Sequence, residues 1–293
     1  MPRTTLALTS FVSGGFSAKL DGRTDFQKYN TSCKTLENFL IHPQGAATRR
    51  VGTQFIAEVK SSAAKTRLIP FEFSTTQTYI MEFGNNYIRF FKDKGQITSG
   101  GSAYEISSPY ATSELFDIKF AQSADVMYLC HPNHDVRKLS RTGHTSWTLA
   151  TVSFTGSPSP AISGADNRPS CVSFFEQRLV FANTNNNPQT LFFSKSGDYE
   201  NMTTGTNADD AMIYTIASNQ VNAIQFLKTQ RTLIVGTTGG EFTVSADGTD
   251  ASITPTNILI NRQSSYGSAN VDAIPAGNAT LFLQRAKRKI REL

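Results

Sequence analysis

Two histidines and an aspartate lie within five residues, at His131, His134 and Asp135, and imidazole and carboxylate groups are common zinc ligands. The cluster directly follows the apolar residues 126–130, and Pro132 between the two histidines is typical of a turn. A metal site would also need a ligand from elsewhere in the chain, and spacing alone assigns no residue to that role. The sequence therefore favours a polar turn, and we expect no metal site.

Three other segments contain residue types that could carry chemistry, but none has a complete pattern. Residues 140–147 resemble the Asp-box turn of sialidase propellers without its aspartate. Residues 237–240 contain two glycines without the lysine of a phosphate-binding loop, so they favour a hairpin. Asp209, Asp210 and Asp247 lie in loop-like segments that lack EF-hand spacing. We expect no catalytic residues and no cofactor, and therefore a protein that is not an enzyme.

The elements that would position these residues form a repeat of short apolar strands. The strands begin 47, 53, 54 and 48 residues apart, which is a mean period of about 50 residues and lies in the range of propeller blades. Five segments carry the repeat: 79–83, 126–130, 179–182, 233–236 and 281–284.

The flanks of these strands repeat as well. Shorter strands precede three of them, at residues 118–120, 172–174 and 224–226, and strands follow Gly- or Asn-rich turns at 87–91, 191–194 and 241–244. The repeated unit is an antiparallel meander. We predict an all-β fold, a β-propeller-like array of about five blades. The alternative is an ordinary β-sandwich with evenly spaced strands.

The last repeat looks incomplete. Residues 285–293 offer no turn signal and no closing strand, and a propeller that stops within a blade would leave an exposed edge. We therefore expect a fragment of a longer protein. The same segment holds five cations, namely Arg285, Lys287, Arg288, Lys289 and Arg291, which could contact a polyanion or form a solvated chain end.

Composition excludes several classes of protein. The 293 residues carry a formal net charge of +5, which is modest for a dedicated nucleic-acid binder. Cys33, Cys130 and Cys171 are odd in number and far apart, which argues against a disulfide framework. No run of 18 apolar residues and no signal-peptide pattern occurs, so we expect no membrane-spanning segment and synthesis in the cytoplasm.

Residues 11–59 precede the repeat and combine glycines with charges. Gly14 and Gly15 allow a turn or a close backbone approach. Ser32 could cap a short helix whose apolar face contains Leu36, Phe39 and Leu40. We expect residues 1–62 to be a docking and oligomerisation segment and residues 63–293 to form the blades.

An ordered set of motifs gives this chain a resemblance to a known family. The motifs are Gly14-Gly15 with Ser17, Leu20-x-Gly22-Arg23-x-Asp25 with Tyr29, Leu36-Glu37-Asn38-Phe39, Pro43-Gln44-Gly45 and Arg49-Arg50-x-Gly52-Thr53. The chain resembles the tail tubular protein B, or nozzle, proteins of short-tailed phages and prophages. The likeness continues along the chain in the following segments: 68–71 with 79–91, 124–125 with 131–132 and Trp147, 178–179, and 193–194 with 197–198. Ala18 and Val51 stand where the family pattern leads us to expect proline.

The resemblance implies a structural virion protein. Such a subunit would form a ring, expected to be hexameric, that docks below the portal and the adaptor or head-to-tail connector and lines the path of DNA ejection. The protein would be made in the host cytoplasm and reside in the virion tail. Candidate interface residues are Gly14, Gly15, Arg23, Asp25, Tyr29, Glu37, Asn38, Arg49 and Arg50; candidate DNA contacts in the lumen are Arg285, Lys287, Arg288, Lys289 and Arg291.

Two other functions remain open. A propeller could bind or hydrolyse glycans as a phage attachment protein, and Trp147 with nearby aromatic residues would then contact the sugar. A propeller scaffold for other proteins is the third possibility, although the sequence lacks a WD-type signature.

Overall fold

The computed structural model describes residues 7–217, 221–248 and 251–293. The chain divides into two compact units, Met1–Phe55 and Ile56–Leu293, and each is described by itself. The sequence-based boundary lies seven residues further along the chain, after residue 62.

The N-terminal unit contains little regular structure. Strand β1 (Gly14–Gly15) pairs in parallel with β2 (Ser32–Cys33), and two 3-10 helices, η1 (Ala18–Leu20) and η2 (Gln27–Thr31), lie between them in the sequence. Strands β3 (Phe39–Ile41) and β4 (Ala47–Arg49) then form an antiparallel hairpin.

The predicted helix after Ser32 is wrong. Ser32 belongs to β2, and its hydroxyl donates a hydrogen bond to the Tyr29 carbonyl at 2.8 Å instead of capping a helix. Asn38 takes a left-handed conformation, with φ of 62°, that an α-helix cannot accommodate. The turn at residues 43–45 then sends the chain back, so that Phe39 becomes the cross-strand partner of Arg49.

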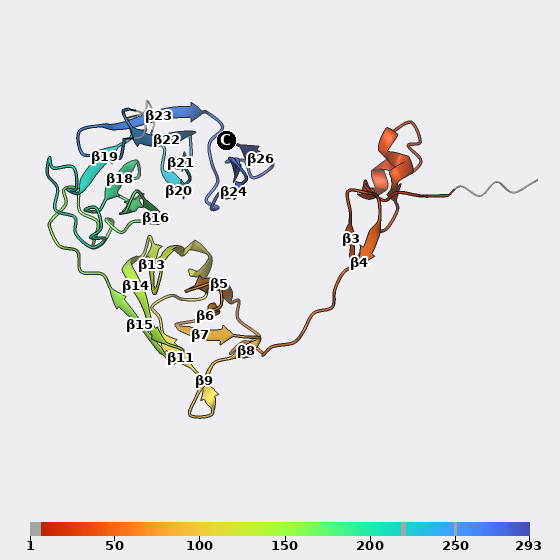
Figure 1. Ribbon diagram of the computed structural model, residues 1–293, viewed down its shortest axis with the longest axis horizontal. Helices are drawn as coiled ribbons and strands as arrows, with labels where there is room; N and C mark the ends of the chain where they lie inside the picture. Colours follow the sequence, from red (N-terminus) through yellow and green to blue (C-terminus); the bar gives the residue numbers. More distant parts are fainter. Residues whose placement is uncertain (1–6, 218–220, 249–250) are drawn as a thin grey trace, which may run out of the picture. The chain divides into compact units, whose positions relative to one another are not determined.

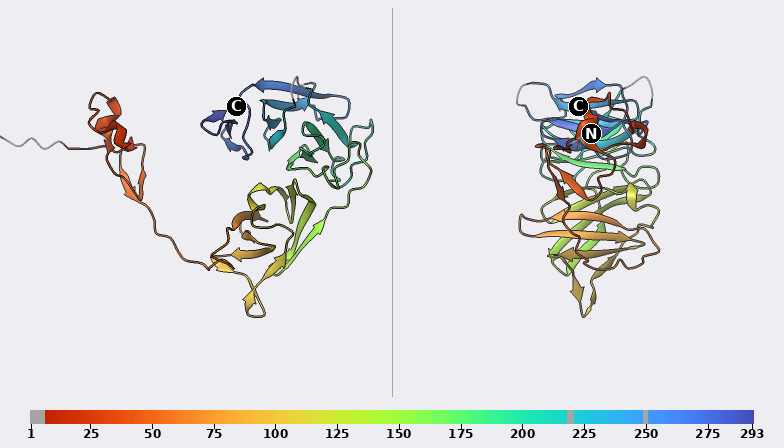
Figure 2. Two further views of the ribbon diagram at one scale, coloured as in Figure 1. Left: turned by 180° about the vertical axis from the view of Figure 1, so that it is seen from behind. Right: turned by 90° about the vertical axis from the view of Figure 1, so that its right-hand side faces the viewer.

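The C-terminal unit is a five-bladed β-propeller, as Figures 1 and 2 show. Its five antiparallel sheets follow one another around a common centre, and the first strands β12, β16 and β20 contact one another in sequence. The first sheet has the order β11-β7-β6-β5 with β8 beside β7, the next three are β12-β13-β14-β15, β16-β17-β18-β19 and β20-β21-β22-β23, and the last is β24-β25-β26.

The first two sheets are built from the following strands. In the first sheet they are β5 (Arg67–Glu72), β6 (Thr78–Gly84), β7 (Tyr87–Lys92), β8 (Gly95–Gln96) and β11 (Glu105–Ser107); β9 (Thr98–Ser99) and β10 (Ser102–Ala103) form a small hairpin, and the 3-10 helix η3 (Leu115–Asp117) precedes the second sheet. The second sheet contains β12 (Lys119–Ser123), β13 (Val126–His131), β14 (His134–Gly143) and β15 (Ser146–Thr151).

The remaining three sheets have the following strands. They are β16 (Cys171–Phe175), β17 (Arg178–Ala182), β18 (Thr190–Phe193), β19 (Met212–Thr215), β20 (Ile224–Thr229), β21 (Leu233–Thr237), β22 (Gly240–Ala246), β23 (Ile258–Ser264), β24 (Ile274–Ala276), β25 (Ala279–Leu283) and β26 (Ile290–Glu292). The repeat predicted from sequence is confirmed, because its five apolar segments became β6, β13, β17, β21 and β25, each the second strand of its sheet.

Apolar side chains pack between successive sheets. Along β13, Met127 and Leu129 pack toward the first sheet, whereas Tyr128 and Cys130 pack toward the third. Strand β17 alternates in the same way and is buried at every residue. A strand buried on both faces reads as a continuous apolar run, which explains why these segments stood out in the sequence.

Within the described part of the chain, the first and fifth sheets carry an apolar cluster on one face only. In β6, Tyr79 and Met81 are buried against the second sheet, while Thr78 and Ile80 remain exposed on the other face. In β25, Thr280 and Phe282 are buried, and Leu281 and Leu283 are half-buried. Among the described residues, the apolar clusters join sheets one to two, two to three, three to four and four to five.

The expectation that residues 285–293 lack a turn and a closing strand is wrong. The chain turns after β25, with Lys287 at φ of 57°, and β26 pairs with β25 through Phe282 and Arg291. A lysine can occupy this left-handed position without the Gly or Asn signal that sequence reading looks for. Among the residues described, no helix has the length and apolar character needed to cross a membrane.

Candidate functional site

The first five candidate interface residues are mostly engaged within the N-terminal unit. Gly14 is buried with φ of 66°, and a Cβ there would lie 3.0 Å from Ile41 Cδ1, so glycine is needed for packing inside the unit. Arg23 donates from Nε and Nη2 to the two carboxylate oxygens of Asp25, at 2.8 and 2.7 Å. Tyr29 is half-buried with its ring 6.0 Å from that of Phe16. Gly15 pairs with Cys33 and is exposed.

The other four candidates flank the β3–β4 hairpin. Glu37 and Asn38 precede β3, and the Asn38 carbonyl accepts a hydrogen bond from the Arg50 amide at 2.8 Å. Arg49 lies in β4, and the side chains of Glu37, Arg49 and Arg50 are all exposed. The structure therefore brings these four residues together at the open end of one hairpin.

The same hairpin leaves apolar side chains in water. Phe39, Leu40 and Ile41 are consecutive in β3 and are 48%, 54% and 40% exposed. Because neighbouring residues of a strand point to opposite faces, each face of this hairpin carries an apolar side chain that the N-terminal unit itself leaves about half exposed. Val51 and Phe55, which follow it, are 79% and 81% exposed.

Four of the five candidate DNA-contacting residues lie in the turn between β25 and β26, and Arg291 lies in β26. Lys287, Arg288 and Lys289 are exposed there. The guanidinium of Arg291 lies 4.1 Å from the centre of the Tyr266 ring, and Arg285 donates weakly to the Thr238 carbonyl at 3.5 Å. Four cations of the cluster are thus exposed, and Arg291 is half-buried against Tyr266.

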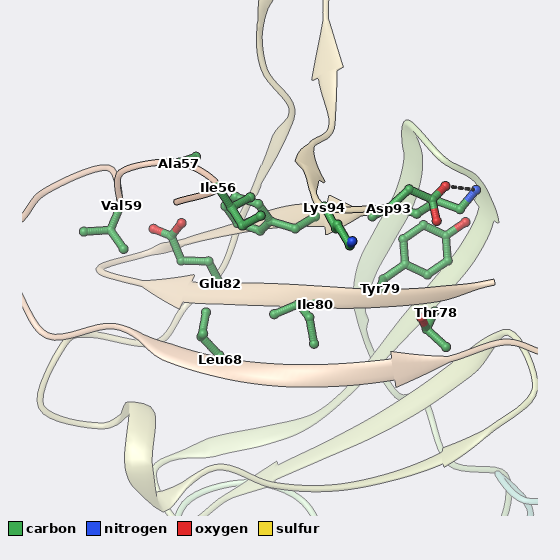
Figure 3. A pocket seen from close by; sticks show the side chains of 12 residues that line it. Ile56, Ala57, Val59, Leu68, Thr78, Tyr79, Ile80, Glu82, Asp93 and Lys94 are labelled. Carbon is green, nitrogen blue, oxygen red and sulfur yellow. Dashed lines mark ion pairs between the residues drawn. The ribbon is translucent and has the colours of Figure 1, made fainter. Parts of the chain in front are cut away.

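A cavity of 580 Å³ lies beside the face of the first sheet that carries Ile80 and Glu82 (Figure 3). Ile56, Ala57 and Val59 form one wall, and Leu68 and Ile80 form the other. Further lining residues are Thr78, Tyr79, Glu82, Phe91, Lys92, Asp93 and Lys94. Sequence reasoning identified no cavity here.

Glu82 is the unusual member of this lining because its side chain is fully buried. Its Oε1 accepts hydrogen bonds from the Tyr87 hydroxyl and from the Lys60 amide, the latter at 3.3 Å. Its Oε2 has no hydrogen-bond partner among the described residues. Burial, and then the bond to Glu82, raise the pKa of Tyr87 well above its usual value, so Tyr87 remains the donor.

A second polar cluster lies at the turn between β13 and β14. His131 and His134 are cross-strand partners, and Glu114 approaches from the segment before η3. One ligand-type atom from each of these three residues lies within 4.8 Å of the others. Glu114 Oε2 is 3.0 Å from His134 Nε2 and accepts the Ala111 amide at 2.9 Å, while Asn133 Nδ2 donates to Oε1 at 3.3 Å.

Burial and hydrogen bonding set the charges of this cluster. Burial alone would raise the pKa of Glu114, but hydrogen bonds from the Ala111 amide, His134 and Asn133 outweigh it and lower the pKa to about 2. Burial lowers the pKa of His131, which favours the neutral imidazole. The cluster presents one carboxylate close to two imidazoles.

Sequence reading missed Glu114 because it lies 17 positions before His131 in the chain. The closeness of Glu114 to the two histidines becomes predictable only when the order of the strands is known. The first two strands of a sheet are antiparallel, so the segment that enters the first strand lies at the same end of the sheet as the turn that follows the second strand.

Trp147, the residue through which a glycan would be expected to bind, is buried in the packing between the first two sheets. Its side chain is 6% exposed, and its ring stacks on Phe90 with centroids 4.4 Å apart. Phe71 and Tyr79 contact it edge-on. Trp147 is therefore part of the core and is not presented to a sugar.

No protein-family model and no curated protein matches the sequence. One similar solved structure is the β-propeller domain of Cps50 (Swd1) from Myceliophteria thermophila, with 11% identity and a TM-score of 0.40 over 73% of this chain and 69% of that chain. The assignment of this chain as a propeller rests on its own five sheets and their order.

Proposed function

We propose that this protein is a structural subunit of a phage tail tube or nozzle ring, which docks below the portal and adaptor and forms part of the DNA ejection conduit. The ordered motifs of residues 14–53 and their likeness to tail tubular protein B support this role. A propeller preceded by a separate N-terminal unit is compatible with it.

The observation that carries the proposal is the β3–β4 hairpin, on both faces of which the N-terminal unit leaves apolar side chains about half exposed. A two-stranded hairpin is marginally stable in water without further packing. Phe39 and Leu40 lie on opposite faces and are each about half exposed, at 48% and 54%. A neighbouring copy of the same chain would cover both faces and remove this apolar surface from water.

Charges beside the hairpin can set the register of that contact. Arg49 and Arg50 lie at its end with Glu37 nearby, and all three are exposed. Exposed charges at the rim of an interface contribute more to orientation than to affinity. Arg23 and Asp25 contribute less to this role, because they already pair with each other at 2.7 Å.

The exposed cations Lys287, Arg288 and Lys289 are proposed to contact DNA in the lumen. Contacts of lysine and arginine with phosphates are independent of sequence and weaken as salt rises. A small cluster of this kind would allow DNA to slide, which suits a conduit better than tight binding.

The test is the oligomeric state of the double variant Phe39→Ser, Leu40→Ser, measured by mass photometry beside the wild type. We expect the wild type to form rings and the variant to remain monomeric with an unchanged melting temperature of the propeller. Val221→Ser is the matched control, because Val221 is 76% exposed in the C-terminal unit. Rings that persist in the double variant would contradict the role of the hairpin.

A further inference from the structure

We propose that Glu114, His131 and His134 form a binding site for one divalent transition-metal ion of the zinc class. This inference is independent of the proposed role in a tail ring. It depends on three features of the cluster: its geometry, a buried ring nitrogen without a partner, and the chemistry of the donor set.

The β13–β14 hairpin fixes the relative position of the two imidazoles. His131 ends β13 and His134 begins β14, and the two residues are register partners across the turn of Pro132 and Asn133. Their ring centres lie 5.1 Å apart. Glu114 joins them from a different part of the chain, so that candidate ligand atoms of all three residues lie within 4.8 Å.

The distances are close to those that a metal requires. A tetrahedral zinc ion holds nitrogen and oxygen ligands at about 2.0 to 2.2 Å, which places pairs of ligand atoms about 3.4 Å apart. Glu114 Oε2 and His134 Nε2 are already 3.0 Å apart. The two pairs that involve His131 lie within 4.8 Å and would have to shorten to reach this spacing.

His131 supplies the observation that an ion pair alone does not explain. Its side chain is 2% exposed, yet Nε2 has no hydrogen-bond partner among the described residues. Nδ1 accepts the Asn133 amide at 3.1 Å, which places the proton of the neutral ring on Nε2. Metal binding at Nε2 would require the proton of the ring to lie on Nδ1. The hydrogen bond from the Asn133 amide would then be lost, and a metal–nitrogen bond would replace this weaker interaction.

The donor set selects the class of ion. Two imidazoles and one carboxylate suit zinc and related transition metals, whereas calcium and magnesium prefer sites made of oxygen atoms. The side chains of Glu114 and His134 are 20% and 21% exposed, which gives an ion access from solvent. A fourth position would remain for water or for a group from a partner.

The Glu114–His134 pair could also be purely structural, and the experiment separates the two roles. Isothermal titration of Zn²⁺ into the chelator-treated full chain should show one ion bound per chain at micromolar strength or tighter. Glu114→Gln and His134→Gln keep the approximate size of each side chain and should each weaken binding at least tenfold. Circular dichroism of each variant confirms that it is folded.

The matched control is His42→Gln, which removes an exposed histidine of the N-terminal unit and should leave the affinity unchanged. Titration of Co²⁺ adds a spectroscopic readout, because imidazole ligation at a tetrahedral site produces visible absorption. Three results would overturn the proposal: no saturable binding at 100-fold excess of Zn²⁺ over protein, binding undiminished in both cluster variants, or binding lost in His42→Gln.

Discussion

Arg178 Nη1 donates a hydrogen bond to the main-chain oxygen of Ser194 at 2.8 Å, although the arginine is only 2% exposed. The same nitrogen donates to the Asp210 carbonyl at 2.7 Å, and Nη2 donates to the Ala208 carbonyl at 2.6 Å. One side chain of β17 thereby holds the long connection between β18 and β19. The planar guanidinium suits this role because it directs several donors at once.

Replacement of this arginine should destabilise the propeller. Arg178→Met keeps the apolar stem but leaves buried carbonyl groups without donors, and we expect a loss of about 3 kcal/mol in the free energy of unfolding. Urea unfolding followed by the fluorescence of Trp147, the single tryptophan, measures it. Arg288→Met, at an exposed position, should change stability by less than about 0.5 kcal/mol. Equal stability of the two variants would refute this account of Arg178.

The three cysteines should differ in reactivity. Cys33 is half-buried, whereas Cys130 and Cys171 are fully buried, and burial raises the pKa of the Cys130 thiol well above its usual value. A thiol reagent should therefore label one cysteine rapidly in the native protein and all three in denaturant. Cys33→Ser should abolish the rapid phase. Rapid labelling of two or three native thiols would contradict the packing around Cys130, between the second and third sheets, or around Cys171, between the third and fourth.

Stability should depend on pH through Glu105. Its carboxylate accepts Lys60 Nζ at 2.6 Å and Arg89 Nε at 3.0 Å, and the bond from Lys60 is the main cause that lowers the pKa of Glu105 below 4.5. A lowered pKa stabilises the folded state above pH 4.5, and this contribution is lost as the pH falls below that value. Because the pair is partly exposed, it contributes about 1 kcal/mol or less.

The measurement is the melting temperature of the wild type and of Glu105→Gln at pH 7 and at pH 3. We expect the wild type to be the more stable of the two at pH 7 and the difference to shrink at pH 3. If the two proteins differed in melting temperature by the same amount at pH 7 and at pH 3, the charge of Glu105 would make no contribution to stability.

The exposed turn of the fifth sheet should bind DNA weakly. We expect dissociation constants of about 10⁻⁴ to 10⁻⁶ M near physiological salt, which is the range of non-specific binding. Lys287→Glu combined with Arg288→Glu should weaken binding about tenfold at low salt. Lys65→Glu combined with Lys94→Glu reverses the same number of exposed charges and should have little effect. Equal losses in the two double variants would show that net charge alone governs binding.

The propeller could be predicted from sequence because the second strands of its second, third and fourth sheets are packed on both faces. Residues 179–182 lie within β17, where every side chain is buried, so the segment appears as a continuous apolar run. The turns between strands carried Gly and Asn signals that matched the hairpins, such as Thr237 opposite Gly240. In these repeats the local sequence pattern and the tertiary packing favour the same strands and turns.

Other features depended on contacts that no local pattern reveals. Glu114 meets His131 and His134 only because the connection between two sheets brings it there. Leu36, Phe39 and Leu40 have helical spacing, but the left-handed Asn38 and the turn at residues 43–45 produce a hairpin instead. The turn at Lys287 contains neither Gly nor Asn. Each case required knowledge of the surrounding fold.

The central claim is that this chain assembles into a ring through its N-terminal hairpin. Mass photometry of the purified wild-type chain over a range of concentrations, with single-particle images of the largest species, tests it most directly. The account predicts closed rings of uniform copy number, with six copies expected. A protein that remains strictly monomeric at every concentration would contradict it.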